Sequence, residues 1–340
     1  MTTPAPSKIR SIQAATQDEA VRVYRELYGD PAVHIRMKLK WRGINSLIYG
    51  LIRKDLPGKS VVDLGCGHGR LALLCSRQAR HVTGVELEDA AVRLARILKD
   101  TLDVSNVDFQ NGDLGSFRAE GRKFDYILLN GVLRHLVDPD IAFKTGAEIL
   151  APGGTFVIGT TLEANFRGSV SDGFRTLLNW PMSLNDFHTA THAWMSRKAD
   201  EFGFTVTKVV GASYNYGWAE LGAQDLKQRM NNVLVDIKDQ VRLLGVNKAA
   251  FDGWVDERGE EGRAVVDELY RRRILKRIPR REPFKIDQTK LRASGLSVDT
   301  VSAITEYLTE DTSDDPYCCE VHPFNLMGGQ AIYLLRRKGR

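Results

Sequence analysis

The chain has few cysteines, no long apolar run and no large excess of charge of one sign. Its 340 residues include four cysteines, too few for a disulfide scaffold. Cys66 lies in a glycine-rich stretch and Cys318 and Cys319 are adjacent, which is not zinc-ligand spacing, so we expect reduced thiols and no metal. No run reaches the roughly 18 apolar residues of a membrane span, and residues 1–10 lack the apolar segment of a secretory signal. We therefore expect a cytoplasmic protein without a membrane partner.

Composition and charge set broad limits on the fold and on partners. Hydrophobic residues make up 43% of the chain, which is enough to fill a core and excludes a disordered protein. The length predicts two domains or one enlarged domain. The net charge of +5 arises from 48 basic and 43 acidic residues, which is too even a balance to identify a partner.

Short apolar runs alternate with helical patterns in the first half of the chain. Apolar residues recur at helical spacing within 17–54. Five buried strands are then expected, at residues 60–64, 81–86, 106–110, 124–130 and 155–160. Between the strands lie patterns typical of amphipathic helices, such as 88–102. Strands that alternate with helices predict a parallel sheet that is covered on both faces.

A glycine loop follows the first expected strand, in the sequence VVDLGCGHGR. Asp63 precedes three alternating glycines, Gly65, Gly67 and Gly69. A dinucleotide fingerprint has the spacing G-x-G-x-x-G, and here the third glycine comes one residue early. A carboxylate two residues before the first glycine would also repel a pyrophosphate. The pattern instead favours a ligand that carries an ammonium group.

Two further acids follow the second and third strands. Glu86 ends the second strand, where a carboxylate can accept hydrogen bonds from both ribose hydroxyls. Asp113, in the sequence QNGDL, can accept from the exocyclic amine of adenine. With Asp63, these acids predict a pocket for an adenosine that carries an amino-acid tail and no phosphate.

Five motifs in order resemble those of the class I S-adenosylmethionine-dependent methyltransferases. They are VVDLGCGHG, VTGVE, NGDL, FDYILLNGVLRHLVDP and LAPGGTFVIG, and they span residues 61–160, with looser support as far as residue 210. The resemblance implies an α/β Rossmann-like fold with a seven-stranded, mostly parallel sheet flanked by helices. It also implies S-adenosyl-L-methionine as the cofactor. Residues 205–210 and 330–335 are then expected to be the sixth and seventh strands.

The resemblance assigns roles to residues of the cofactor site. Asp63 and the first two glycines of the loop lie under the methionine part, and Glu86 holds the ribose. Leu87 packs beside the adenine, Asp113 reads its amine, and Asn130 offers a carbonyl to the ammonium group. The complete set is Asp63, Gly65, Cys66, Gly67, Glu86, Leu87, Gly112, Asp113, Leu114 and Asn130.

Histidines are the candidates for proton transfer at the acceptor. The cofactor activates the methyl group, so the protein mainly aligns the nucleophile, but a hydroxyl acceptor needs a base. His135 follows the fourth strand and is our catalytic candidate; it could also contact the acceptor without proton transfer or cap the loop before Pro139. His188 and His192 share a helical face. They could bind a metal, line an acceptor cleft with Trp194, or lie on a solvated helix.

The spacing of these segments predicts four regions. They are a helical N-terminal lid at 1–58, the cofactor domain at 59–217, a helical insertion at 218–327 that covers the acceptor, and a last strand at 328–340.

The predicted insertion carries charged and helical patterns of its own. Residues 271–281 hold seven basic residues and residues 306–320 hold six acids. The basic run would bind a phosphorylated substrate or RNA, or the two clusters balance each other on a solvated surface. Residues 290–308 loosely resemble a helix-turn-helix, but the second helix contains no Lys or Arg, which argues against DNA.

The sequence thus predicts a methyltransferase that acts on a small-molecule acceptor, with O-methylation favoured over N-methylation. The residues after the fourth strand, Asn130-Gly131-Val132-Leu133, lack an N-P-P-Y motif, which argues against methylation of base amines. A methyltransferase of RNA or protein is the alternative, and a non-catalytic cofactor-binding protein is a second one. The oligomeric state is left open.

Overall fold

The computed structural model describes most of the predicted cofactor domain and parts of the remaining chain. The described residues are 32, 35, 42–117, 119–161, 190–213, 268, 271–272, 275–277, 284–309, 319–321 and 330–339. The predictions made for His188 lie outside these residues, as do those for most of the N-terminal lid and of the insertion.

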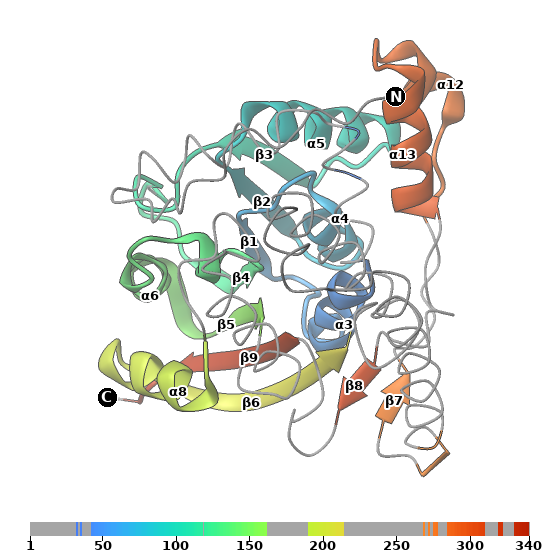
Figure 1. The fold of residues 1–340 in the computed structure, drawn as a ribbon. Coiled ribbons are helices and arrows are strands. Elements are labelled where there is room, and N and C mark those ends of the chain that lie inside the picture. The colour runs from blue at the N-terminus through green and yellow to red at the C-terminus, as the bar shows by residue number, and fades with distance from the viewer. Residues whose placement is uncertain are drawn as a thin grey trace, which may run out of the picture.

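A single nine-stranded sheet organises the fold, with the strand order β3-β2-β1-β4-β5-β9-β6-β8-β7 (Figure 1). The strands are β1 Ser60–Leu64, β2 His81–Glu86, β3 Val107–Asn111, β4 Phe124–Asn130, β5 Leu150–Thr161, β6 Phe204–Ser213, β7 Leu275–Arg277, β8 Cys319–Val321 and β9 Gln330–Arg337. Strands β1 to β5 pair in parallel, and β9 pairs antiparallel with both β5 and β6. The seven predicted strands are present, which confirms the α/β class. The short strands β8 and β7, within the predicted insertion, extend the sheet beyond β6.

Helices cover both faces of the sheet (Figure 1). They are α3 Arg42–Ile52, α4 Arg70–Ser76, α5 Asp89–Thr101, the 3-10 helix η2 Leu133–His135, α6 Asp140–Ile149, α8 His192–Glu201, α12 Gln288–Ala293 and α13 Val298–Thr309. The alternation of side chains along a strand divides the core into two layers. Val61 packs in the layer of α3, α4 and α5, whereas Val62 packs in the layer of α6 and α8. This arrangement explains why the parallel strands are apolar on both faces.

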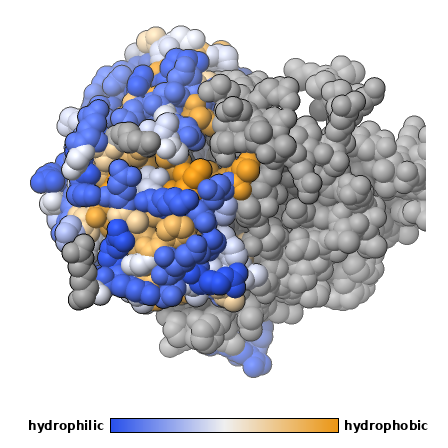
Figure 2. Space-filling model, turned by 90° about the vertical axis from the view of Figure 1, so that its left-hand side faces the viewer, coloured by the Kyte–Doolittle hydropathy of each residue, from blue (hydrophilic) through white to orange (hydrophobic). Residues whose placement is uncertain are grey.

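An aromatic cluster packs α6 against α8 on one side of the molecule. Phe143 of α6 is fully buried; its ring stacks on Phe202, with centroids 5.7 Å apart, and meets Trp194 edge-on at 6.3 Å. Figure 2 shows this side from outside, with hydrophilic residues around scattered hydrophobic ones. Among the described residues, no helix is long and apolar enough to cross a membrane.

The end of the predicted insertion packs into the core of the cofactor domain. Phe284, Leu291 and Ile304 belong to the hydrophobic cluster that lies under α4 and α5. Helices α12 and α13 are joined by a turn in which Gly295 has a φ of 77°, and they occupy the segment that loosely resembles a helix-turn-helix. Its apolar face is buried against the domain, so residues 284–309 are an integral part of the cofactor domain's packing. The division into four regions remains a prediction.

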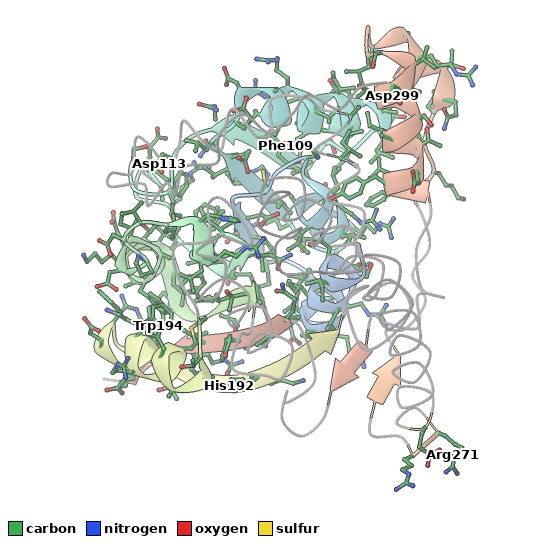
Figure 3. The ribbon with its side chains drawn as sticks, viewed as in Figure 1. Phe109, Asp113, His192, Trp194, Arg271 and Asp299 are labelled. Carbon is green, nitrogen blue, oxygen red and sulfur yellow. The ribbon has the colours of Figure 1, made fainter. Side chains whose placement is uncertain are left out.

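A substitution at Gly84 of β2 tests how closely the strands pack under the glycine loop. A Cβ there would lie 2.4 Å from Cδ1 of Phe109 on β3 (Figure 3) and 2.9 Å from Sγ of Cys66. Overpacking of this kind typically costs about 1–3 kcal/mol, so we expect Gly84→Ala to lower the free energy of unfolding by that amount in urea titrations. Gly339→Ala is the control, because its Cβ would meet nothing within 4 Å. Equal unfolding midpoints for both variants would contradict the packing.

Candidate functional site

The predicted site residues meet at one edge of the sheet. The glycine loop follows β1, Glu86 ends β2, Asp113 follows β3 and Asn130 ends β4. These four strands are adjacent and parallel, so their carboxyl ends share an edge. β1 lies where the strand order reverses, which is where ligands bind in open α/β folds.

The glycine loop is held against β2 by backbone hydrogen bonds. The N–H groups of Gly65 and Cys66 both donate to the carbonyl oxygen of Val85, at 2.7 and 3.0 Å. Gly65 has a φ of 74°, and a Cβ there would lie 2.3 Å from Cγ2 of Val132. Gly67 has a φ of 55°, but a Cβ there would meet nothing within 4 Å. The backbone therefore requires glycine at both positions, and the side of the loop at Gly67 is open to a ligand.

Glu86 connects the loop to the end of β2. Its side chain is 3% exposed. Oε2 accepts from the N–H of Gly67 at 2.8 Å, and Oε1 accepts from the N–H of Glu88 at 3.1 Å. A carboxylate in this position carries negative charge to the edge of the sheet, directly beside the open glycine.

Asp63 lies beneath the loop with an unsatisfied oxygen. It is 2% exposed and accepts a hydrogen bond from the N–H of Ala72. Its Oδ2 is buried without a hydrogen-bond partner. Burial, and then the neighbouring charge of Glu86, raise the pKa of Asp63 to about 7. A cationic group beside Asp63 would compensate both effects, so the residues present fit a positively charged ligand.

Cys66 is chemically inert in this setting. Its thiol donates to the carbonyl of Gly67 at 3.7 Å. Burial, followed by the charges of Asp63 and Glu86, raises its pKa well above the ordinary value. The thiol is therefore neutral and unsuited to nucleophilic or metal chemistry. Among the described residues, no group of three or more His, Cys, Asp or Glu side chains could hold a metal.

The ends of β2 and β3 are tied together beside Asp113. Nδ2 of Asn111 donates to the carbonyl of Leu87 at 2.8 Å, and the N–H of Gly112 donates to that of Glu86 at 2.9 Å. Oδ2 of Asp113 accepts from the N–H groups of Gly115 and Ser116, at 3.0 and 3.2 Å. Asp113 thus shapes a turn with one oxygen, and no described residue engages Oδ1. Asn111 was missed by the sequence analysis, although it lies within the motif that carries Asp113.

Asn130 pairs with a residue from helix α3. Its Nδ2 donates to Oδ1 of Asn45 at 2.8 Å, and its own Oδ1 is buried without a hydrogen-bond partner. A Cβ at Gly159 would lie 2.3 Å from that Oδ1, which places the amide over the neighbouring strand β5. Nothing in the sequence indicated Asn45, a polar residue in the mostly apolar helix α3.

Two described histidines make a side-chain hydrogen bond through a ring nitrogen. Nε2 of His135 accepts from Nε of the adjacent Arg134 at 3.3 Å. His192, at the start of α8 (Figure 3), has its Nδ1 2.8 Å from the hydroxyl oxygen of Tyr333 on β9. Burial lowers the pKa of His192 and raises that of Tyr333, which is 1% exposed, so both are neutral at neutral pH. The Tyr333 partner was not anticipated, because 141 residues separate the pair.

Contacts in the structure also bear on the predictions for Trp194 and for the basic run 271–281. Trp194 packs against Phe143, as described above, which places its ring against the core. Arg271 and Arg272 both pair with Glu268, at 2.5 and 2.6 Å, and Arg271 lies far from Asp113 (Figure 3). These two arginines share one carboxylate, which lies outside the acidic run 306–320, so the expected balance between the two runs stays a prediction. Arg273 and Cys318 lie outside the described residues.

Comparison with known proteins identifies the class. Residues 55–202 match a methyltransferase domain family. The ubiquinone biosynthesis O-methyltransferase of Nitrosospira multiformis is 29% identical over 184 residues, covering 51% of this chain and 74% of that protein. The enzyme of the same name from Coxiella burnetii is 26% identical over 164 residues, covering 47% and 69%. The magnesium protoporphyrin IX methyltransferase of Synechocystis PCC 6803, solved with bound SAH, is 20% identical with a TM-score of 0.45, covering 56% of this chain and 85% of that one.

The family match and the curated relatives agree with the motifs and the fold. Residues 55–202 thus form a methyltransferase domain, whose motifs and fold are those of the class I S-adenosylmethionine-dependent methyltransferases. The protein is an enzyme, and its cofactor is S-adenosyl-L-methionine.

The ionisation of Asp63 should be visible in the stability of the ligand-free protein. Its pKa is about 7 in the folded chain against an ordinary 3.8, so the folded state binds a proton that the unfolded state has released. The stabilisation from this proton is complete below the unfolded pKa and is lost as the pH rises through about 7. We expect the free energy of unfolding, relative to that of Asp63→Asn, to fall between about pH 4 and about pH 7 in urea titrations. Parallel pH profiles for the two proteins would contradict the raised pKa.

Proposed function

We propose that the protein transfers a methyl group from S-adenosyl-L-methionine to a hydroxyl group of a small-molecule acceptor. The observation that carries the donor side is the buried, unsatisfied Asp63 next to Glu86 and the open glycine loop. The acceptor chemistry is supported by the curated relatives, which are named as O-methyltransferases of ubiquinone biosynthesis.

The proposed donor contacts follow from the geometry of the edge. S-Adenosyl-L-methionine supplies a methyl group activated by a sulfonium. Asp63 and the backbone at Gly65 and Gly67 bind the methionine part, while Glu86 accepts from the ribose hydroxyls. These contacts would hold the donor in one place, so that an acceptor could be aligned with its methyl group.

The adenine would lie between the ends of β2 and β3. Oδ1 of Asp113 accepts from the exocyclic amine, because Oδ2 is already engaged by the turn. Leu87 and the buried Leu114 supply apolar contact for the ring, and Gly112 allows a close approach of the backbone. Cys66 contributes its backbone N–H to the loop and leaves its thiol neutral.

Asn130 and Asp63 would share the positive charge of the donor. The Asn130 carbonyl accepts from the ammonium, and Asn45 holds the side-chain amide of Asn130 in one orientation. A cation beside Asp63 favours its carboxylate and lowers its pKa. Donor affinity therefore rises with pH through about 7, as Asp63 ionises.

His135 and His192 can play different parts at the acceptor. A buried phenol needs an acceptor for its proton, so the Tyr333 hydroxyl donates to Nδ1 of His192 and the His192 proton lies on Nε2. His192 is then a hydrogen-bond donor toward an acceptor oxygen. His135 has its Nε2 lone pair directed at Arg134, and it becomes a base when Arg134 releases it. We therefore keep His135 as the proposed base.

The acceptor side of the site would be completed by the rest of the insertion. The insertion at 218–327 remains our proposal for the acceptor lid, and its residues 284–309 pack into the core, so the cover over the acceptor would come from the rest of that range. No described contact favours RNA, because Arg271 and Arg272 are paired with Glu268.

A labelled-donor assay tests this function. The protein is incubated with methyl-labelled S-adenosyl-L-methionine and a panel of phenols and catechols, and in parallel with total RNA and total protein. We expect label in a small-molecule ether. Label in RNA or protein, with none in the phenols, would contradict the proposed acceptor.

Glu86→Ala tests the ribose contact. A hydrogen bond to a charged group contributes about 1.5–3 kcal/mol, less the compensation by water, so we expect a loss of about 2–4 kcal/mol in binding of S-adenosylhomocysteine by calorimetry. Glu86→Gln, which retains one acceptor oxygen, should show a smaller loss. Because Glu86 also accepts from Gly67, melting temperatures must accompany both titrations. Unchanged affinity in a folded Glu86→Ala would refute the ribose contact.

His135→Ala tests the base. General-base help is worth about 10²–10⁴-fold, so turnover of a hydroxyl acceptor should fall by that factor while donor affinity stays normal. His192→Ala should raise the acceptor KM more than it lowers kcat, because it removes a donor and no base. A loss below about tenfold in His135→Ala would show that alignment alone drives the step.

A further inference from the structure

The glycine loop needs an external constraint to keep one conformation. Gly65, Gly67 and Gly69 all have positive φ angles, of 74°, 55° and 80°. Glycines lose more backbone freedom on ordering than other residues do. The ligand side at Gly67 is open, so contacts that order the loop in the ligand-free protein must come from β2 and from behind the loop.

Two polar side chains of the loop are buried on that rear side. His68 is 3% exposed and Arg70 is 2% exposed. Arg70 is the first residue of α4, where a positive charge opposes the helix dipole. A guanidinium buried at this position costs free energy unless other groups compensate it, and so its contacts indicate what it does.

The contacts of Arg70 come from the far end of the sequence. Its Nη1 donates to the main-chain carbonyl of Tyr307. Its Cζ lies 5.2 Å from the centroid of the Tyr307 ring and 5.7 Å from that of Phe284. The ring of His68 meets the ring of Tyr307 edge-on, with centroids 6.5 Å apart. The Tyr307 carbonyl belongs to the last turn of α13, where carbonyl groups lack helical partners and attract cations.

Residues 284–309, which we call the docked segment, are firmly attached to the domain. Leu291, Ile304 and Leu308 are fully buried. The N–H of Phe284 donates to the carbonyl of Leu308 at 3.2 Å, which brings the two ends of the segment together beside Arg70. A buried segment of this kind provides a fixed surface for the loop to rest on.

We propose that the docked segment holds the glycine loop in its donor-binding conformation, with Arg70 and Tyr307 as positioning residues for the cofactor. Arg70 and His68 flank Gly69, so their contacts with Tyr307 restrict the last turn of the loop. A loop that is already ordered binds its ligand more tightly, because binding then involves no further loss of the loop's conformational entropy. The end of the insertion thus serves the donor site, whatever the acceptor is.

Arg70→Met tests this role, with Arg77→Met as the matched control. Arg77 lies at the other end of α4, and its Cζ is 4.2 Å from the centroid of the same Phe284 ring. Both variants remove a cation from the docked segment, but only Arg70 is next to the loop. We expect Arg70→Met to weaken binding of S-adenosylhomocysteine at least about tenfold, and Arg77→Met to leave it unchanged. Amide exchange at residues 67–70 should quicken only in Arg70→Met.

If Arg70→Met does not fold, a second pair of variants tests whether the docked segment positions the glycine loop. Tyr307→Phe keeps the ring and the carbonyl and should bind S-adenosylhomocysteine like the natural protein, whereas Tyr307→Ala should bind it weakly. All titrations are made well below each melting temperature. Normal affinity in a folded Arg70→Met or in Tyr307→Ala, with only a lower melting temperature, would overturn the proposal. Since no acceptor is present, failure here is independent of the proposed O-methylation.

Discussion

The hydrogen bond from the N–H of Gly67 to the carboxylate of Glu86 joins the main parts of the donor site. It connects the loop after β1 with the end of β2, at the point where the strand order of the sheet reverses. It also brings negative charge close to Asp63, which is already buried, and so contributes to the raised pKa of that group. The candidate site therefore holds excess negative potential in the ligand-free protein, which a cationic donor bound as we propose would relieve.

The fold outside the loop fixes the positions of the carboxylates of Asp63, Glu86 and Asp113. Parallel strands with continuous apolar faces place the three acids at one edge, and α4 and α5 cover the face behind them. Asn111 and Gly112 tie the end of β3 to the end of β2, so the distance between Glu86 and Asp113 is set by the backbone. The docked segment then closes the rear of the loop through Arg70.

The meeting of the candidate donor-site residues at one edge of the sheet could be predicted from the sequence, because each of these residues is placed by a nearby strand. Each acid or glycine of the motif lies within a few residues of a strand end, and alternation of apolar and glycine-rich segments identifies those ends. β6 and β9 were also predicted from their apolar runs, although about a hundred residues separate them. The pairs Arg70–Tyr307, His192–Tyr333 and Asn45–Asn130 were not predictable, because each joins residues far apart in the chain and no periodicity encodes such a contact. The short strands β7 and β8 were missed for a related reason, since three residues carry no pattern.

The central claim is that the glycine loop and its acids form a site for a cationic adenosine ligand that has no phosphate. Calorimetric titration of the natural protein with S-adenosyl-L-methionine, S-adenosylhomocysteine and NAD⁺ tests it directly. The account predicts one site per chain for the first two ligands and no binding of NAD⁺, whose pyrophosphate would face Asp63. It also predicts that the affinity for both sulfur ligands falls below about pH 7, because both carry the ammonium group that gains from ionised Asp63. Binding of NAD⁺ in preference to both, or affinities for the two sulfur ligands that do not change with pH, would contradict the account.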